Sequence, residues 1–188
     1  MKHSIPKKIV LIGASTGGPG QIQKIINSLP KLQNTTIVIA QHMVDGFMES
    51  FANRFQNISH NSISVVKDNQ IFESNNIYIC EGETKLTNNS FSKKKSSLDS
   101  YNPNINILFN SFSSLTKDYE ILCVILTGIG DDGVEACKNL TLNGARSLTE
   151  TQESAIVDGM PSRARALVPN IEAYDIKKIV EIINRFCE

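Results

Sequence analysis

Short runs of aliphatic residues alternate along this chain with segments of helical periodicity, and this alternation constrains the fold more than any other feature. Residues 9–12, 37–40 and 121–126 are continuous apolar runs with the length of a buried strand. Residues 21–29 and 176–186 repeat Ile or Leu at three- and four-residue intervals, as an amphipathic helix does. Because strands separated by such helices are typical of βαβ units, we expect an α/β fold. The expected architecture is a doubly wound, mostly parallel sheet with helices on both faces.

The rest of the chain fits one domain spanning residues 1–188. Further strands are predicted at 63–66, 77–80 and 145–148, and further helices at 46–55, 105–115 and 134–142. A chain of 188 residues with 40% hydrophobic content is large enough to bury one sizeable core. Residues 1–7 are expected to be a flexible tail. Residues 82–104, rich in Asn, Ser and Lys, are expected to be a long surface excursion with room for a small hairpin.

Composition excludes several classes of function. Lys plus Arg number 19 and Asp plus Glu number 19, so there is no basic excess to neutralise nucleic-acid phosphates or to attract an anionic membrane. No apolar run approaches the roughly 20 residues of a membrane span. The four cysteines form no C-x-x-C pair, which argues against a thiolate zinc site, and no secretory signal is evident. We therefore expect a cytoplasmic protein whose cysteines are buried thiols.

Residues with chemical potential gather where three predicted strands end, which is where open α/β sheets place their ligands. After the first strand, Gly13-x-Ser15-x-Gly17 matches the tight strand-to-helix turn that exposes a nucleophilic serine. A Walker phosphate loop would need a lysine that is absent before Pro19, and a dinucleotide fingerprint would need glycine in place of Ser15. A plain tight turn remains the alternative to a nucleophile.

His42 follows the second strand, next to the place where Ser15 should emerge. An isolated histidine is more often structural than catalytic, so the prediction that His42 is catalytic depends on its position beside Ser15. Asp131 and Asp132 follow the strand at 121–126, and either could orient an imidazole or cap the next helix. Spacing does not choose between them. The order Ser, His, Asp also differs from the Ser, Asp, His order of α/β-hydrolases.

Together these strings resemble the catalytic domain of the chemotaxis protein-glutamate methylesterases, the CheB family. The matching strings are residues 12–19 (IGASTGGP), 41–43 (QHM), 50–54 (SFANR), 126–133 (LTGIGDDG) and 158–161 (DGMP). They occur in the family's order and span almost the whole chain.

The resemblance implies a role for each site residue. Ser15 is implied to be the nucleophile, His42 the general base and then acid, and Asp132 the orienting carboxylate, with Asp131 second. The backbone N–H of Ile129 is implied to help form the oxyanion hole, although the family usually has Met at this position. The expected substrate pocket also includes Thr16, Gly17 and Met160.

The implied activity is hydrolysis of glutamyl γ-methyl esters on the cytoplasmic helices of chemoreceptors, with deamidation of receptor glutamines as a second activity. Neither metal nor organic cofactor is expected. The expected partners are methyl-accepting chemotaxis receptors, with recruitment to receptor clusters and without nucleic-acid binding or membrane insertion. The alternatives are a catalytically silent receptor-docking protein and a nucleotide-binding α/β domain, the second of which lacks the lysine and acidic ribose partner it needs.

Three departures from the family pattern accompany these expectations. Val44 and Asp45 stand where the family commonly has prolines, and Asn110 replaces a usual arginine. Only 12 residues precede Gly13, so we expect a catalytic site open at rest, without a covering receiver domain. The excursion that contains Lys93, Lys94 and Lys95 is expected to be a solvated loop. The alternative hypothesis is that these lysines steer an acidic receptor toward the site by electrostatic attraction.

Overall fold

Within residues 5–44, 46–97 and 101–188, which the computed structural model describes, seven parallel strands form one sheet in the order β3-β4-β2-β1-β7-β8-β9. The strands are β1 (Lys8–Ala14), β2 (Thr35–Gln41), β3 (Ser62–Val65), β4 (Asn76–Ile79), β7 (Glu120–Ile125), β8 (Arg146–Glu150) and β9 (Glu172–Tyr174). The expectations for residues 1–4, Asp45 and residues 98–100 lie outside the described residues.

The order of the strands reverses at β1. After β1, the chain forms β2, β3 and β4 on one side of β1, with β3 at the outer edge and β4 between β3 and β2. It then crosses to the other side of β1 and forms β7, β8 and β9 in order outward. Ala14 pairs with Gln41 on β2, and Gly13 pairs with Ile125 on β7, so the carboxyl ends of these three strands lie side by side. A crevice beyond such a reversal is the usual ligand site of an open α/β sheet.

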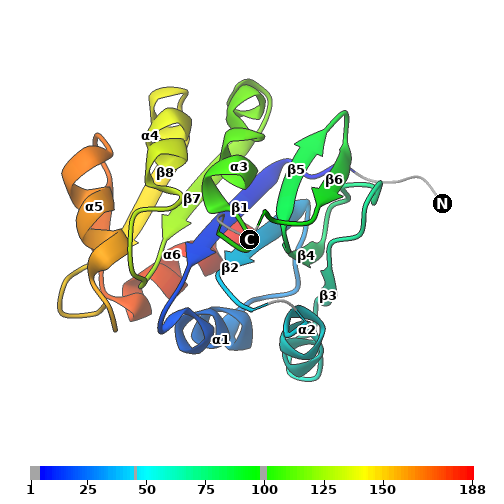
Figure 1. The fold of residues 1–188 in the computed structure, drawn as a ribbon, viewed down its shortest axis with the longest axis horizontal. Coiled ribbons are helices and arrows are strands. Elements are labelled where there is room, and N and C mark those ends of the chain that lie inside the picture. Colours follow the sequence, from blue (N-terminus) through cyan, green and yellow to red (C-terminus); the bar gives the residue numbers. More distant parts are fainter. Residues whose placement is uncertain (1–4, 45, 98–100) are drawn as a thin grey trace.

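Two layers of helices cover the sheet (Figure 1). One face packs against α1 (Gly18–Ser28), α2 (Met48–Gln56) and α6 (Ile176–Cys187). The other face packs against α3 (Ile105–Asn110), α4 (Val134–Leu142) and α5 (Gly159–Leu167). Successive residues of β1 alternate between the two hydrophobic clusters, as the two-residue period of a strand requires. The predicted doubly wound α/β fold is confirmed.

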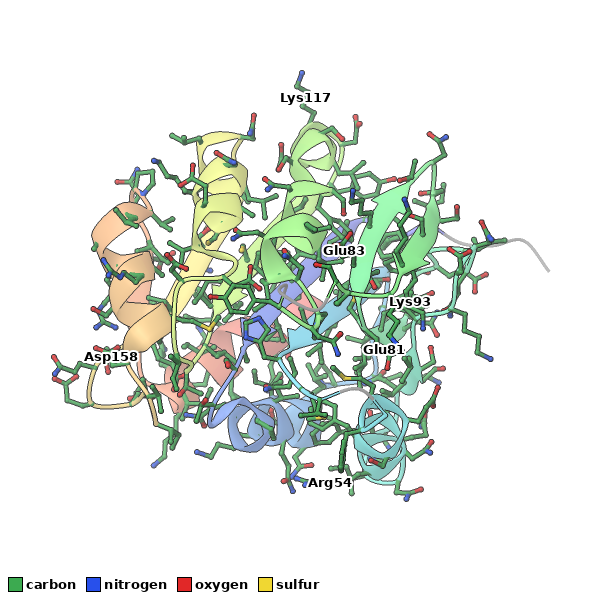
Figure 2. All side chains as sticks on the ribbon, viewed as in Figure 1. Arg54, Glu81, Glu83, Lys93, Lys117 and Asp158 are labelled. Carbon is green, nitrogen blue, oxygen red and sulfur yellow. The ribbon has the colours of Figure 1, made fainter. Side chains whose placement is uncertain are left out.

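The polar excursion contains the small hairpin for which its length left room. Strands β5 (Glu83–Thr87) and β6 (Ser90–Lys94) pair antiparallel, and Leu86 and Phe91 are buried in the same cluster as α3. At the base of the hairpin, Lys93 forms an ion pair with Glu81 at 3.1 Å (Figure 2). Two buried hydrophobic side chains therefore anchor the excursion to the domain.

Several element predictions were wrong in detail. The helix predicted at 105–115 ends at Asn110, and a 3-10 helix (Ser113–Lys117) follows, because the serine-rich sequence between them favours local hydrogen bonds over a continued helix. Helix α5 and strand β9 were missed. Strand β9 has only three residues, all half-buried at the sheet edge, so it carries no apolar run.

The expected tail at residues 1–7 is described from Ile5 onward. The backbone of Lys7 hydrogen-bonds to both Asn34 and Glu120. Lys7 therefore continues the pairing of β1 by one residue toward the N-terminus. In the described part of the chain, no helix is long and apolar enough to cross a membrane.

Candidate active site

The strand-to-helix turn after β1 presents Ser15 at the reversal point of the sheet. The backbone N–H of Ser15 donates to the carbonyl of Thr127 (2.9 Å), and the side-chain amide of Gln41 donates to the Ser15 carbonyl (2.8 Å). Gly17 caps α1 with φ of 84°, a conformation that a glycine adopts without steric cost. Within the described residues, the Ser15 hydroxyl has no hydrogen-bond partner, so it is available to a ligand. In enzymes without substrate, catalytic hydrogen bonds are often long and tighten when substrate binds.

His42 stands beside Ser15 because β2 is the neighbour of β1. Its backbone N–H donates to the Ala14 carbonyl at 2.9 Å, which continues the strand pairing by one residue. The imidazole Nε2 lies 2.8 Å from Oδ2 of Asp132, and the side chains of these two residues are 13% and 1% exposed. Since the carboxylate occupies Nε2, the ring nitrogen left to accept a proton from Ser15 is Nδ1.

Asp132 is held on both oxygens by the first turn of α3. The N–H of Ile105 donates to Oδ2 at 2.8 Å, and the N–H of Asn106 donates to Oδ1 at 3.0 Å. The carboxylate therefore accepts three hydrogen bonds in a buried position, which fixes its orientation toward His42. Asp131 is exposed instead. The structure thus separates the two aspartates that the sequence left open, and it brings Asp132 to the histidine.

The turn that follows β7 faces Ser15. A side chain on Gly128 would collide with the Cβ of Ser15 and the sulfur of Met160, so glycine is needed for this close approach. Within the described residues, the N–H of Ile129 donates no hydrogen bond, so it is free to hold an oxyanion. The Ile129 side chain is 65% exposed and forms part of the site's surface.

The remaining predicted pocket residues fall in different places. Thr16 is exposed, and Gly17 lies under the side chain of Ile156. Met160 has no exposed surface and packs beneath Gly128. Its backbone N–H donates to the Gly128 carbonyl at 2.8 Å, and it therefore supports the turn from below.

Sequence reasoning missed a buried carboxylate behind the nucleophile. Glu150, at the end of β8, has no exposed surface and accepts hydrogen bonds from the side chains of Gln21 (2.7 Å) and Ser154 (3.0 Å) and from the N–H of Thr127 (2.8 Å). Burial raises the pKa of the Glu150 carboxyl above its ordinary value. Thr127 in turn hydrogen-bonds to the backbone of Ser15 and Thr16. Glu150 therefore supports the turn that carries Ser15 indirectly, through Thr127. The only signal in the sequence was a charged residue two positions after the strand predicted at 145–148.

Among the described residues, no group of His, Cys, Asp and Glu side chains could hold a metal ion. The arrangement can perform acyl transfer. At one edge of the sheet it brings together an imidazole oriented by a buried carboxylate with a serine hydroxyl and a backbone N–H that have no hydrogen-bond partner in the described part of the chain.

Comparison with known proteins agrees with this chemistry. A family model described as CheB methylesterase matches residues 10–183. The chain belongs to the CheB methylesterase family. The fold of the chain matches the crystal structure of the Thermotoga maritima CheB methylesterase catalytic domain with a TM-score of 0.83 and 27% sequence identity, covering 96% of this chain and 99% of that one.

Curated relatives in the CheB family are longer proteins. The chain is 34% identical over 191 residues to the protein-glutamate methylesterase/protein-glutamine glutaminase of Halalkalibacterium halodurans, covering 97% of this chain and 54% of that protein. It is 37% identical over 174 residues to the protein of the same name from Bacillus subtilis, covering 87% and 48%. The chain thus spans about half the length of these relatives and corresponds to a CheB catalytic domain.

Proposed function

We propose that this CheB-family chain is a serine hydrolase that removes methyl esters from glutamate side chains on the cytoplasmic helices of chemoreceptors, releasing methanol. The observation that carries this proposal is the 2.8 Å contact between His42 and the buried Asp132, beside a serine with a free hydroxyl. The relatives named protein-glutamate methylesterase support the choice of a glutamyl ester as substrate.

The first half of the reaction forms an acyl-enzyme. The Ser15 oxygen attacks the ester carbonyl carbon while Nδ1 of His42 takes the hydroxyl proton, and Asp132 stabilises the imidazolium. The carbonyl oxygen gains negative charge, which the N–H of Ile129 stabilises. His42 then gives its proton to the departing methoxy oxygen. Methanol leaves, and the glutamyl group remains bound to Ser15 as an ester.

The second half returns the enzyme to its starting state. Water attacks the glutamyl-serine ester while His42 takes a proton from the water. His42 then gives that proton to the departing Ser15 oxygen, and the receptor's glutamate side chain leaves as a carboxylate. None of these steps uses a metal or an organic cofactor. A receptor glutamine presents the same carbonyl with ammonia as the leaving group, so the site also supports deamidation, as the glutaminase part of the relatives' name suggests.

This function places the protein in the cytoplasm, at receptor clusters. Two other functions predict different behaviour: a catalytically silent docking protein would bind receptors without chemistry, and a nucleotide-binding domain would use the glycine-rich turn for phosphate. The free Ser15 hydroxyl next to the paired His42 and Asp132 favours the hydrolase over both.

The test is methanol release from receptor membranes that carry labelled methyl esters. The wild-type chain should release methanol, and Ser15→Ala should remove nearly all of that release. Ser28→Ala, at the opposite end of α1, is the matched control and should behave as wild type. If Ser15→Ala released methanol at the wild-type rate, or the wild type released none, the proposed function would be wrong.

A further inference from the structure

The side chain of Tyr101 lies flat against the imidazole of His42. The two ring centroids are 4.8 Å apart and the ring planes differ by 3°. Tyr101 is 46% exposed, whereas His42 is 13% exposed, so the tyrosine ring covers a face of the imidazole that water would otherwise reach. Asp132 contacts the same imidazole at its edge, through Nε2. The tyrosine therefore acts on a part of the base that the carboxylate does not reach.

The backbone next to Tyr101 is fixed to the loop that carries His42. The N–H of Met43 donates to the Asn102 carbonyl at 2.9 Å, and the Asn102 side chain donates to the Met43 carbonyl at 3.2 Å. The Asn102 side chain also accepts from the N–H of Gly82, where the excursion begins, at 2.8 Å. The two ends of the excursion are thus joined to each other and to the residue after His42, which sets the tyrosine ring in place.

The hydroxyl end of Tyr101 reaches the turn after β7. A Cβ built on Gly130 would lie 3.2 Å from the tyrosine Oη, so the hydroxyl covers the backbone immediately after Ile129. One side chain from the polar excursion therefore extends from the base to the turn with the free N–H. The excursion at residues 82–104 therefore contributes Tyr101 to the active site.

We propose that Tyr101 is a positioning residue for His42, and this inference rests on the proposed hydrolase function. The stacked ring holds the plane of the imidazole at the position beside the Ser15 turn. It also stabilises the imidazolium that forms when His42 takes the serine proton, because a cation over an aromatic face is attracted by the negative charge of the π system. Among the described residues, the charged group in contact with His42 is Asp132, which all the test variants keep.

The first test measures the NMR chemical shifts of the His42 ring protons in wild type, Tyr101→Leu and Tyr101→Phe. Leucine keeps the face covered but removes the aromatic ring and its ring current, so the His42 ring-proton signals should move downfield. Phenylalanine keeps the ring and should keep the wild-type signals. The chain has three histidines, and the His42 signals are the ones missing from His42→Gln. Tyr119→Leu, next to the opposite end of β7, is the matched control and should leave the His42 signals unchanged.

The second test measures hydrolysis of a small methyl ester by the same variants. Tyr101→Leu should lower kcat about tenfold at a nearly unchanged KM, and Tyr101→Phe should restore most of the rate. The proposal is wrong if Tyr101→Leu keeps the wild-type His42 signals or the wild-type kcat, or if Tyr101→Phe behaves like Tyr101→Leu. A wild-type chain without esterase activity would instead refute the proposed function, and the NMR shifts would still show whether Tyr101 holds the His42 ring.

Discussion

Replacing Asp132 with asparagine should lower both the stability of the fold and the rate of hydrolysis. The size of each loss can be worked out from the contacts of the carboxylate. The carboxylate accepts three hydrogen bonds, from His42, Ile105 and Asn106. An asparagine has one oxygen, so its amide group must face at least one of these donors. If the oxygen stays toward His42 and Ile105, the N–H of Asn106 loses its acceptor, at a cost of roughly 1–2 kcal/mol. For a chain of this length, that loss lowers Tm by about 5 °C.

The loss of activity should be far larger than the loss of stability. Without the negative charge, the imidazolium of His42 is no longer stabilised, and by analogy with serine proteases the rate should fall on the order of 10⁴-fold. The assay is methyl ester hydrolysis at a temperature well below the Tm of Asp132→Asn. Asp131→Asn changes the exposed neighbouring carboxylate and should stay within about twofold of wild type, as surface substitutions usually do. A severe loss in Asp131→Asn together with a mild one in Asp132→Asn would refute the assignment.

Three further predictions concern stability, docking and thiol reactivity. Because burial raises the folded-state pKa of Glu150 above the ordinary 4.5, its stabilising contribution is full below that pH and is lost as the pH rises through the raised value. The Tm of wild type relative to Glu150→Gln should therefore fall between pH 4.5 and pH 7, and a constant difference would contradict the buried-carboxylate argument. Replacing Lys93, Lys94 and Lys95 with glutamine should slow receptor demethylation at low salt and leave a small ester unaffected, whereas equal losses on both substrates would exclude steering. All four cysteines are buried, and burial raises the pKa of Cys187 to about 12, so Ellman's reagent should react with them only after denaturation; rapid reaction in the native protein would disagree with the structure.

The central strands and the ends that carry the chemistry could be predicted from the sequence alone. Continuous apolar runs fix β1, β2 and β7, and a parallel sheet brings their carboxyl ends to one edge, so Ser15 and His42 follow directly. The choice of Asp132 over Asp131 needed either the family resemblance or the structure. Two adjacent carboxylates have the same local pattern, and only the start of α3, 27 residues away in sequence from Asp132, distinguishes them.

The supporting residues could not be predicted because long-range packing places them. Tyr101 lies in a polar stretch whose composition indicates a solvated loop, and its contact with His42 depends on how the hairpin returns to the domain. Glu150 ends a short strand, where a charged residue usually signals exposure, and its burial depends on donors from α1 and from the turn after β7. Neither position has a local motif.

Covalent labelling with a fluorophosphonate reports whether Ser15 is a nucleophile activated by His42. Intact-mass measurement should show a single adduct on the wild-type chain, and peptide mapping should place that adduct on Ser15. Labelling should be absent in Ser15→Ala and strongly slowed in His42→Gln, because the hydroxyl then has no base to take its proton. An unlabelled wild-type chain, an adduct on another serine, or equal labelling rates in wild type and His42→Gln would show that Ser15 is not a nucleophile activated by His42.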